Sequence, residues 1–335
     1  MKTKIVRDLV PLIIVTAVLF VIGCGSTSPP PGAEKRPPIR ISYIYSAGDY
    51  PLIVAKAKGF FEKQGVDVEL VALEDASQML TSFVAGRIDG CDYSGDGPPR
   101  LLAKNSKVRV VFFIGFCEGC DEIVASPEIQ TVADLKGKKI GVQVGTFGEV
   151  FVEAMLRTAG LTTADVELVN TDEKLVVPYL KDGTIQAGHT WEPYGTQAVK
   201  EKAGAKILFT TKQARRLLPY AMTLRETVLQ ERPDDVRAFV RACFQAAEYM
   251  KDPANAKEVS EIVGKALNAP PEDILHDHDD FEFFSVEEAK KAFASSSGPS
   301  LVSSVLQKHV EFLVKIGALR TRPDLDKIAD PSFLP

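Results

Sequence analysis

The chain has 335 residues and a formal net charge of −5, with 45% hydrophobic and 25% charged residues. This is an ordinary globular composition, and the length suffices for two hydrophobic cores. No basic patch and no alternation of aromatic and basic residues occurs, so we expect no nucleic-acid partner.

The first 23 residues have the pattern of an export signal. Lys2, Lys4 and Arg7 precede a nearly unbroken apolar run at 9–23. A helix of this length spans about 22 Å, which is shorter than the roughly 20 residues that a bilayer core requires. A basic start followed by a short apolar run is typical of a signal peptide. A short transmembrane anchor is the alternative.

Cys24 stands at the end of the apolar run, directly after the small residue Gly23. The stretch Val21-Ile22-Gly23-Cys24 resembles the lipobox of bacterial lipoproteins. That resemblance implies cleavage before Cys24 and a lipid on its sulfur. The Pro-rich segment at 24–38 has no apolar periodicity, and such a chain is extended, rising about 3.1 Å per residue. We therefore expect a signal peptide at 1–23 and a lipidated tether at 24–38. They would hold a folded domain on the periplasmic side of a bacterial membrane, or on the cell surface where the host has one membrane.

Strands and helices alternate in the next part of the chain. Apolar periodicity predicts strands and helices in the order strand 39–45, helix 51–65, strand 66–73, helix 75–87, strand 88–95 and strand 108–115. This order indicates a largely parallel sheet with helices on its faces.

A second α/β unit is expected to begin near Ser126. Its predicted elements are helices at 131–137, 146–159 and 173–183, and strands at 138–145, 165–171, 185–191 and 205–211. A strand at 218–224 then returns to the first unit, and 225–317 is mostly helical. We predict an α/β fold of two lobes around a hinged cleft. Lobe 1 would comprise 39–125 and 220–335, and lobe 2 would comprise 126–219.

Three segments carry a family resemblance in chain order. They are PLIVAKAKGFFEKQGVDVELV, DLKGKKIGVQVGTFGEVFVEAMLRTAGL and LKDGTIQAGHTWEPY. They resemble the NMT1-like substrate-binding proteins of ABC transporters, which serve nitrate, sulfonates, taurine and thiamine-pyrimidine precursors. The resemblance implies a type II periplasmic-binding-protein-like fold, no catalysis and no cofactor. It also implies a monomer that delivers a small-molecule solute to permease and ATPase subunits. An iron-dependent thiamine-pyrimidine synthase-like enzyme and a ligand-presenting sensory module are the alternatives.

Ligands of open α/β sheets bind beyond the carboxyl ends of strands. In the first lobe, two predicted strand ends are followed by small and acidic residues, and the candidate ligand-binding residues there are Ser46, Asp49, Tyr50, Ser94, Asp96 and Gly97. Each aspartate could instead cap a helix or form a turn.

In the second lobe, Thr146, Phe147 and Gly148 join a predicted strand to a predicted helix. Free N–H groups at a helix start favour an anion. Trp191 and Glu192 follow another strand, where an indole can wall a pocket and a carboxylate can hold an amine. A plain turn and a helix cap are the alternative interpretations.

Three of these candidates, Asp49, Asp96 and Glu192, would form an acidic mouth. This arrangement differs from what a bare nitrate site requires. It favours a ligand with a cationic or amine portion.

Cys117 and Cys120 form a single C-x-x-C motif. A local disulfide or inert thiols are the favoured interpretations, because one such pair is weak evidence for zinc. Cys91 is expected near this pair, and Cys243 is expected on a helix, with its side chain in the hydrophobic core. The acidic and histidine-rich run at 276–280 could bind a divalent ion, although a solvated loop is the more ordinary interpretation. We predict no metal site.

Overall fold

The structure of the protein is a computed structural model that describes residues 36–335 except 105, 193, 295–299 and 301. The predicted signal peptide, Cys24 and most of the predicted tether therefore lie outside the described residues. The chain divides into the units Met1–Arg36 and Pro37–Pro335, and every strand and helix given below belongs to the second unit. Within the described residues, no helix combines the length and the apolar character needed to cross a membrane.

The first sheet has six strands in the order β11-β4-β10-β3-β1-β2. They are β1 (Ile39–Tyr43), β2 (Val68–Ala72), β3 (Gly90–Ser94), β4 (Val108–Cys117), β10 (Pro219–Arg225) and β11 (Phe281–Phe283). β1 pairs in parallel with β2 and β3, which confirms the parallel β-α-β-α-β start expected from the sequence. β10 lies antiparallel between β3 and β4, and β11 is antiparallel to β4.

The second sheet has five strands in the order β7-β6-β8-β5-β9. They are β5 (Asp121–Ala125), β6 (Lys139–Val142), β7 (Glu167–Asn170), β8 (Ala187–Trp191) and β9 (Lys206–Thr210). β6 is parallel to β7 and β8, whereas β5 is antiparallel to β8 and β9. Each sheet is therefore mixed, with a parallel part and an antiparallel part.

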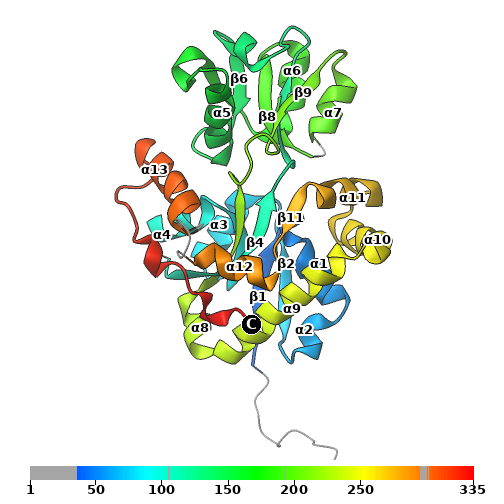
Figure 1. The fold of residues 1–335 in the computed structure, drawn as a ribbon, viewed down its shortest axis with the longest axis vertical. Helices are drawn as coiled ribbons and strands as arrows, with labels where there is room; N and C mark the ends of the chain where they lie inside the picture. The colour runs from blue at the N-terminus through cyan, green and yellow to red at the C-terminus, as the bar shows by residue number, and fades with distance from the viewer. Residues whose placement is uncertain (1–35, 105, 193, 295–299, 301) are drawn as a thin grey trace, which may run out of the picture. The chain divides into compact units, whose positions relative to one another are not determined.

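Helices flank both sheets (Figure 1). Those that follow strands of the first sheet or belong to the C-terminal part are α1 (Tyr50–Ala57), α2 (Phe60–Lys63), α3 (Ala76–Val84), α4 (Gly97–Ala103), α8 (Glu226–Glu231), α9 (Pro233–Lys251), α10 (Ala256–Leu267), α11 (Pro271–Asp279), α12 (Val286–Phe293) and α13 (Gln307–Lys315). Those between strands of the second sheet are α5 (Phe147–Thr158), α6 (Val176–Asp182) and α7 (Tyr194–Glu201).

The boundary expected at residue 125 is wrong. β4 ends at Cys117 in the first sheet, and β5 already pairs with β8 and β9 in the second sheet. The chain therefore crosses between the sheets at residues 118–120. The prediction failed because the two carboxylates that open the Asp121–Ala125 stretch hid a strand of which every residue is buried. The return crossing lies between β9 and β10, which begins at Pro219.

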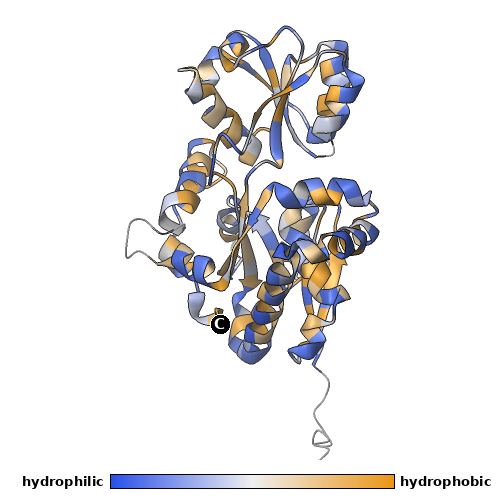
Figure 2. Ribbon diagram, turned by 45° about the vertical axis from the view of Figure 1, so that its right-hand side comes forward, coloured by the Kyte–Doolittle hydropathy of each residue, from blue (hydrophilic) through white to orange (hydrophobic). Residues whose placement is uncertain are grey.

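Apolar side chains pack between the helices and the first sheet. The ring of Phe61 on α2 stacks on Phe239 of α9 at a centroid distance of 5.7 Å, and Phe112 of β4 lies 5.1 Å from Phe244 of α9. Hydrophobic and hydrophilic residues occur on the same helices, as expected when one side of each helix is buried (Figure 2). This packing fixes the strand ends from which the candidate site is built.

Candidate functional site

A cavity of about 580 Å³ lies between the carboxyl ends of strands from both sheets. We call it the cleft. Its lining includes residues after β1 and β3 of the first sheet, and residues after β6 and β8 of the second. It also includes Cys120 of the crossing between β4 and β5, and Asp121, the first residue of β5, so both sheets and the connection between them contribute.

Nine of the eleven residues chosen from the sequence line the cleft, namely Ser46, Asp49, Ser94, Asp96, Thr146, Phe147, Gly148, Trp191 and Glu192. Tyr50 and Gly97 are not among its lining residues. Tyr50 is fully buried at the start of α1. Gly97 packs at the start of α4, where a Cβ atom would lie 2.0 Å from Cγ of Tyr93. Both residues contribute to packing beside the cleft.

Asp96 is paired with a cation. Its Oδ2 accepts a hydrogen bond from Nε of Arg100 at 2.5 Å, and its Oδ1 accepts one from Oγ of Ser94 at 3.0 Å. Nη2 of Arg100 also donates to the carbonyl oxygen of Gly145, which follows β6 in the second sheet. Arg100 of α4 therefore pairs with Asp96 and links α4 to the turn after β6 of the second sheet.

The turn before α5 uses its own hydrogen-bond donors. The N–H of Gly145 donates to Oε2 of Glu149 at 3.0 Å, and the N–H of Gly148 donates to Oγ1 of Thr146 at 3.2 Å. The hydroxyl of Thr146 donates to the carbonyl oxygen of Gln143 at 2.7 Å. The expected anion site would need such donors to be free, and the carboxylate of Glu149 already engages the N–H of Gly145, two residues before α5.

Glu192 caps a helix. Its Oε1 accepts from Oγ1 of Thr196 at 2.7 Å and its Oε2 accepts from the N–H of Thr196 at 3.2 Å, in the first turn of α7. The hydrogen bonds of Glu192 are therefore those of a helix cap, although its side chain also lines the cleft. Trp191 lines the cleft beside it, with its ring 6.2 Å from that of His189.

Two polar residues of β5 and β8 were not among the residues chosen from the sequence, although His189, in a predicted strand just before Trp191, could be expected to face either the cleft or the core. Nε2 of His189 lies 2.8 Å from Oδ1 of Asp121, and both residues are buried and line the cleft. Since a carboxylate accepts, Nε2 of His189 carries a proton. Nδ1 of His189 lies 4.0 Å from Oε1 of Glu173, and no hydrogen bond reaches it among the described residues. The only sequence signal was a histidine inside a predicted strand.

Asp92 was also missed, although it lies within the strand predicted at 88–95. It is 3% exposed in β3 and lines the cleft near Asp49, which is 1% exposed. Oδ2 of Asp49 accepts from the N–H of Ile44 at 2.9 Å. Among the described residues, no hydrogen bond of ordinary geometry reaches Oδ1 of Asp49 or either carboxylate oxygen of Asp92. We call Asp49 and Asp92 the carboxyl pair.

The environment of the carboxyl pair favours its protonated form. Burial raises the pKa of Asp49 well above its ordinary value, the charge of Asp92 raises it further, and the N–H of Ile44 lowers it in part. Burial likewise raises the pKa of Asp92, and the neighbouring N–H of Tyr93 offsets this only partly. Two buried carboxyl groups this close cannot both ionise easily without a cation.

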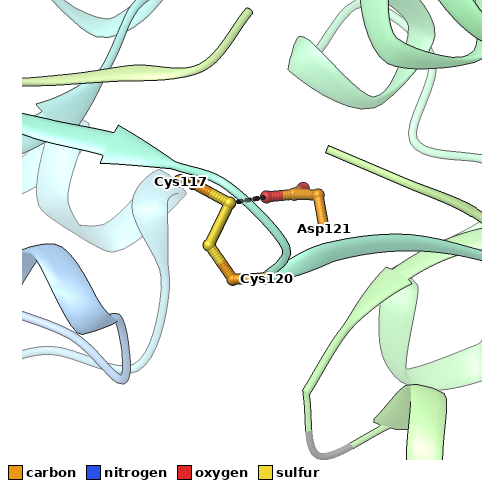
Figure 3. Close-up of side chains that lie close together, drawn as sticks. All are labelled: Cys117, Cys120 and Asp121. Atoms are coloured by element: carbon orange, nitrogen blue, oxygen red, sulfur yellow. Dashed lines mark hydrogen bonds between the residues drawn. A yellow bond between two sulfur atoms is a disulfide. The ribbon is translucent and has the colours of Figure 1, made fainter. Parts of the chain in front are cut away.

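Cys117 and Cys120 are joined in a disulfide at the crossing from β4 to β5 (Figure 3). Sγ of Cys117 lies 3.5 Å from Oδ2 of Asp121. The two sulfurs and the Asp121 carboxylate lie within 4.8 Å of one another, but sulfurs bonded to each other are poor metal ligands. Cys91 and Cys243 are free and buried, and burial raises the pKa of both thiols.

The run at 276–280 forms the end of α11 and the residue after it. Nδ1 of His276 lies 3.9 Å from Oδ2 of Asp280, and its Nε2 lies 3.8 Å from Oε1 of Glu192. Half-exposed His276 therefore sits among carboxylates. Within the described residues, the grouping close enough to hold a metal comprises Cys117, Cys120 and Asp121, and does not include this run.

The disulfide should stabilise the crossing between the sheets. Replacing both Cys117 and Cys120 with serine is expected to lower the free energy of unfolding by roughly 2 kcal/mol, because a short covalent loop is lost from the unfolded chain. Urea unfolding with and without dithiothreitol measures this. Reduction should destabilise the native protein by a similar amount and leave the double variant unchanged. Equal stability of oxidised and reduced native protein would contradict the expectation.

The two sheets with a cleft at their strand ends define a periplasmic-binding-protein-like fold. The crystal structure of the periplasmic aliphatic sulphonate binding protein SsuA from Escherichia coli has the same fold, with a TM-score of 0.73 and 17% identity, covering 88% of this chain and 92% of that one. The pattern of the NMT1/THI5-like family matches residues 48–256, and the chain belongs to that family.

Two relatives cover most of the chain. A protein named as a binding protein in Brucella abortus is 27% identical over 81% of this chain and 79% of its own length. A protein named as an aliphatic sulfonates-binding protein in Bacillus subtilis is 28% identical over 72% of this chain and 74% of its own length.

Proposed function

We propose that this protein is the extracytoplasmic solute-binding component of an ABC importer. It captures a small polar or charged organic solute and delivers it to permease and ATPase subunits. The observation that carries this proposal is the cleft itself, because residues from both sheets and from the crossing line one cavity. The names of the relatives, which refer to binding proteins, support the same function.

Contacts between the parts of the chain that carry the two sheets indicate how binding is coupled to closure. In addition to the bond from Arg100 to Gly145, Nζ of Lys315 on α13 lies 3.6 Å from Oε2 of Glu153 on α5. The rings of Phe147 and His309 lie 5.9 Å apart. A solute that touches both sheets adds to these contacts only when the cleft is closed, so it shifts the population toward the closed form. The closed form then docks on the permease as a monomer.

The division of the chain into lobes is part of the proposal. One lobe is built on the first sheet and the other on the second, with the crossing moved to 118–120. The solute candidates are sulfonate-, taurine- or nitrate-like compounds and thiamine-pyrimidine-like compounds. The cavity of about 580 Å³ admits any of these by size.

The export signal and lipid anchor complete the proposal. Replacing Cys24 with alanine should move the protein from the membrane fraction to the soluble extracytoplasmic fraction, because the sulfur that would carry the lipid is gone. Cell fractionation and intact-mass measurement test this. Replacing the neighbouring Ser26 with alanine should leave both the lipid mass and the membrane fraction unchanged. An unlipidated native protein would contradict the anchor.

Mass spectrometry of small molecules released from the purified protein tests the binding function. We expect one solute at near-equal molar ratio, released unchanged after incubation with the protein. Conversion of that solute, together with bound iron, would instead support the enzyme alternative. Partnership with a sensor kinase rather than a permease would support the sensory alternative.

A further inference from the structure

The hydrogen-bonding groups of the cleft are unequally used. Three of its donor groups are engaged: the guanidinium of Arg100 bonds Asp96 and Gly145, and the N–H groups of Gly145 and Gly148 bond within their own turn. An anionic solute needs free donors or unpaired cations. Arg100 is the one arginine or lysine among the described lining residues, and it is already paired.

The acceptors of the cleft, in contrast, include several without a donor. Seven of its described lining residues carry a carboxyl group. Most of these have partners, as shown for Asp96, Asp121 and Glu192. The carboxyl pair is the exception: among the described residues, no hydrogen bond of ordinary geometry reaches Oδ1 of Asp49 or either oxygen of Asp92, although both side chains are almost completely buried.

The sheet holds the carboxyl pair in place. Asp92 lies in β3 opposite Met222 of β10, so its backbone is fixed by a central strand. Gly48 allows the close approach of the two segments, because a Cβ atom at residue 48 would lie 2.4 Å from Oδ2 of Asp92. Buried acceptors cost free energy unless something donates to them. A rigid pair of such acceptors in a cleft is a built site for a donor.

We propose that the cleft binds an organic cation with at least two N–H groups, which donate to the carboxyl pair of Asp49 and Asp92. The buried carboxyl group of Glu173, 4.0 Å from Nδ1 of His189, adds a further acceptor from the part of the chain that carries the second sheet. Trp191 and Phe147 supply aromatic surface that also attracts a cation. This inference rests on the proposed solute-binding function and narrows its solute to positively charged compounds.

Three probes of nearly equal size separate charge from shape: benzamidine carries a positive charge, benzamide none and benzoate a negative charge. Ethanesulfonate serves as a second anion. Thermal unfolding of solute-free full-length protein with each probe should show stabilisation by benzamidine and none by benzoate or ethanesulfonate. Stabilisation by an anion without stabilisation by benzamidine would overturn the inference while leaving the solute-binding function intact. Stabilisation by no probe would also overturn it.

Variants tie the binding to the carboxyl pair. Asp92→Asn and, as a second variant, Asp49→Asn should each weaken benzamidine binding by about 10- to 100-fold in calorimetry, because a charge-assisted hydrogen bond is lost. The matched control is Asp234→Asn, which removes the same charge from an exposed position in the first turn of α9. Its affinity should stay within twofold of the native value. Unchanged affinity in both carboxyl-pair variants would overturn the assignment, and circular dichroism verifies that each variant is folded.

Discussion

Replacing Arg100 with methionine should lower the free energy of unfolding by roughly 3 kcal/mol, because it leaves a buried carboxylate without its cation. Asp96 is buried, its Oδ2 lies 2.5 Å from Nε of Arg100, and the side chain of Arg100 is 21% exposed. The variant also loses the hydrogen bond to the carbonyl of Gly145. Urea unfolding at pH 7 measures the change.

The chain offers a control of the same geometry. Arg157 and Glu153 form another pair four residues apart on a helix, also at 2.5 Å, but the side chain of Arg157 is 71% exposed. Arg157→Met should cost only about 0.3–0.5 kcal/mol. Adding Asp96→Asn to Arg100→Met should restore most of the lost stability, since the unpaired charge is then removed. Equal losses of unfolding free energy in Arg100→Met and Arg157→Met would show that burial does not set the strength of these ion pairs.

The second large effect is on pH dependence. Because the folded protein raises the pKa of Asp49 and Asp92, it binds protons more tightly there than the unfolded chain does. The contribution of the pair to stability is therefore fully present below the ordinary aspartate pKa of about 4, and is lost as the pH rises through the raised values. Asp92→Asn removes the charge, so it should be more stable than the solute-free native protein at pH 8, and this advantage should shrink toward pH 4.

The other titratable groups near the pair do not change this sign. Tyr220 of β10, Cys91 of β3 and Cys243 of α9 interact with it, and burial raises the pKa of each, so all three are uncharged at pH 7. Asp121 is the further carboxylate near Tyr220 and adds negative charge. Urea unfolding between pH 4 and pH 8 gives the result. The account would be contradicted if the native protein became more stable relative to Asp92→Asn as the pH rises. The control Asp234→Asn should show no pH-dependent difference from the native protein.

Local sequence patterns predicted most of the strands. Apolar patterns correctly indicated β1 to β4 and β6 to β10, and a glycine-bounded turn correctly preceded α5. Two strands were missed for physical reasons. β11 has three residues, which is too short to show a period, and β5 opens with Asp121 and Glu122, whose burial depends on partners elsewhere in the chain.

The candidate site was predictable only as a location. The rule that ligands bind beyond the carboxyl ends of strands correctly located nine of the chosen residues at the cleft, because the rule depends only on topology. Which groups remain unpaired could not be predicted, since it depends on three-dimensional partners. Glu149 reaches back to Gly145, Arg100 bonds a residue after β6 of the second sheet, and among the described residues no hydrogen bond of ordinary geometry reaches the carboxyl oxygens of Asp92. The anion site expected at Gly148 stays a prediction, with the N–H groups of Gly145 and Gly148 engaged within the turn.

Small-angle X-ray scattering tests most directly whether the cleft holds the solute between the two sheets. The protein is measured after its co-purified solute has been removed, and again with that solute restored at saturation. We predict a smaller radius of gyration with solute bound, because contacts from both sheets favour closure. Identical scattering curves in the two states would contradict closure around a solute in this cleft.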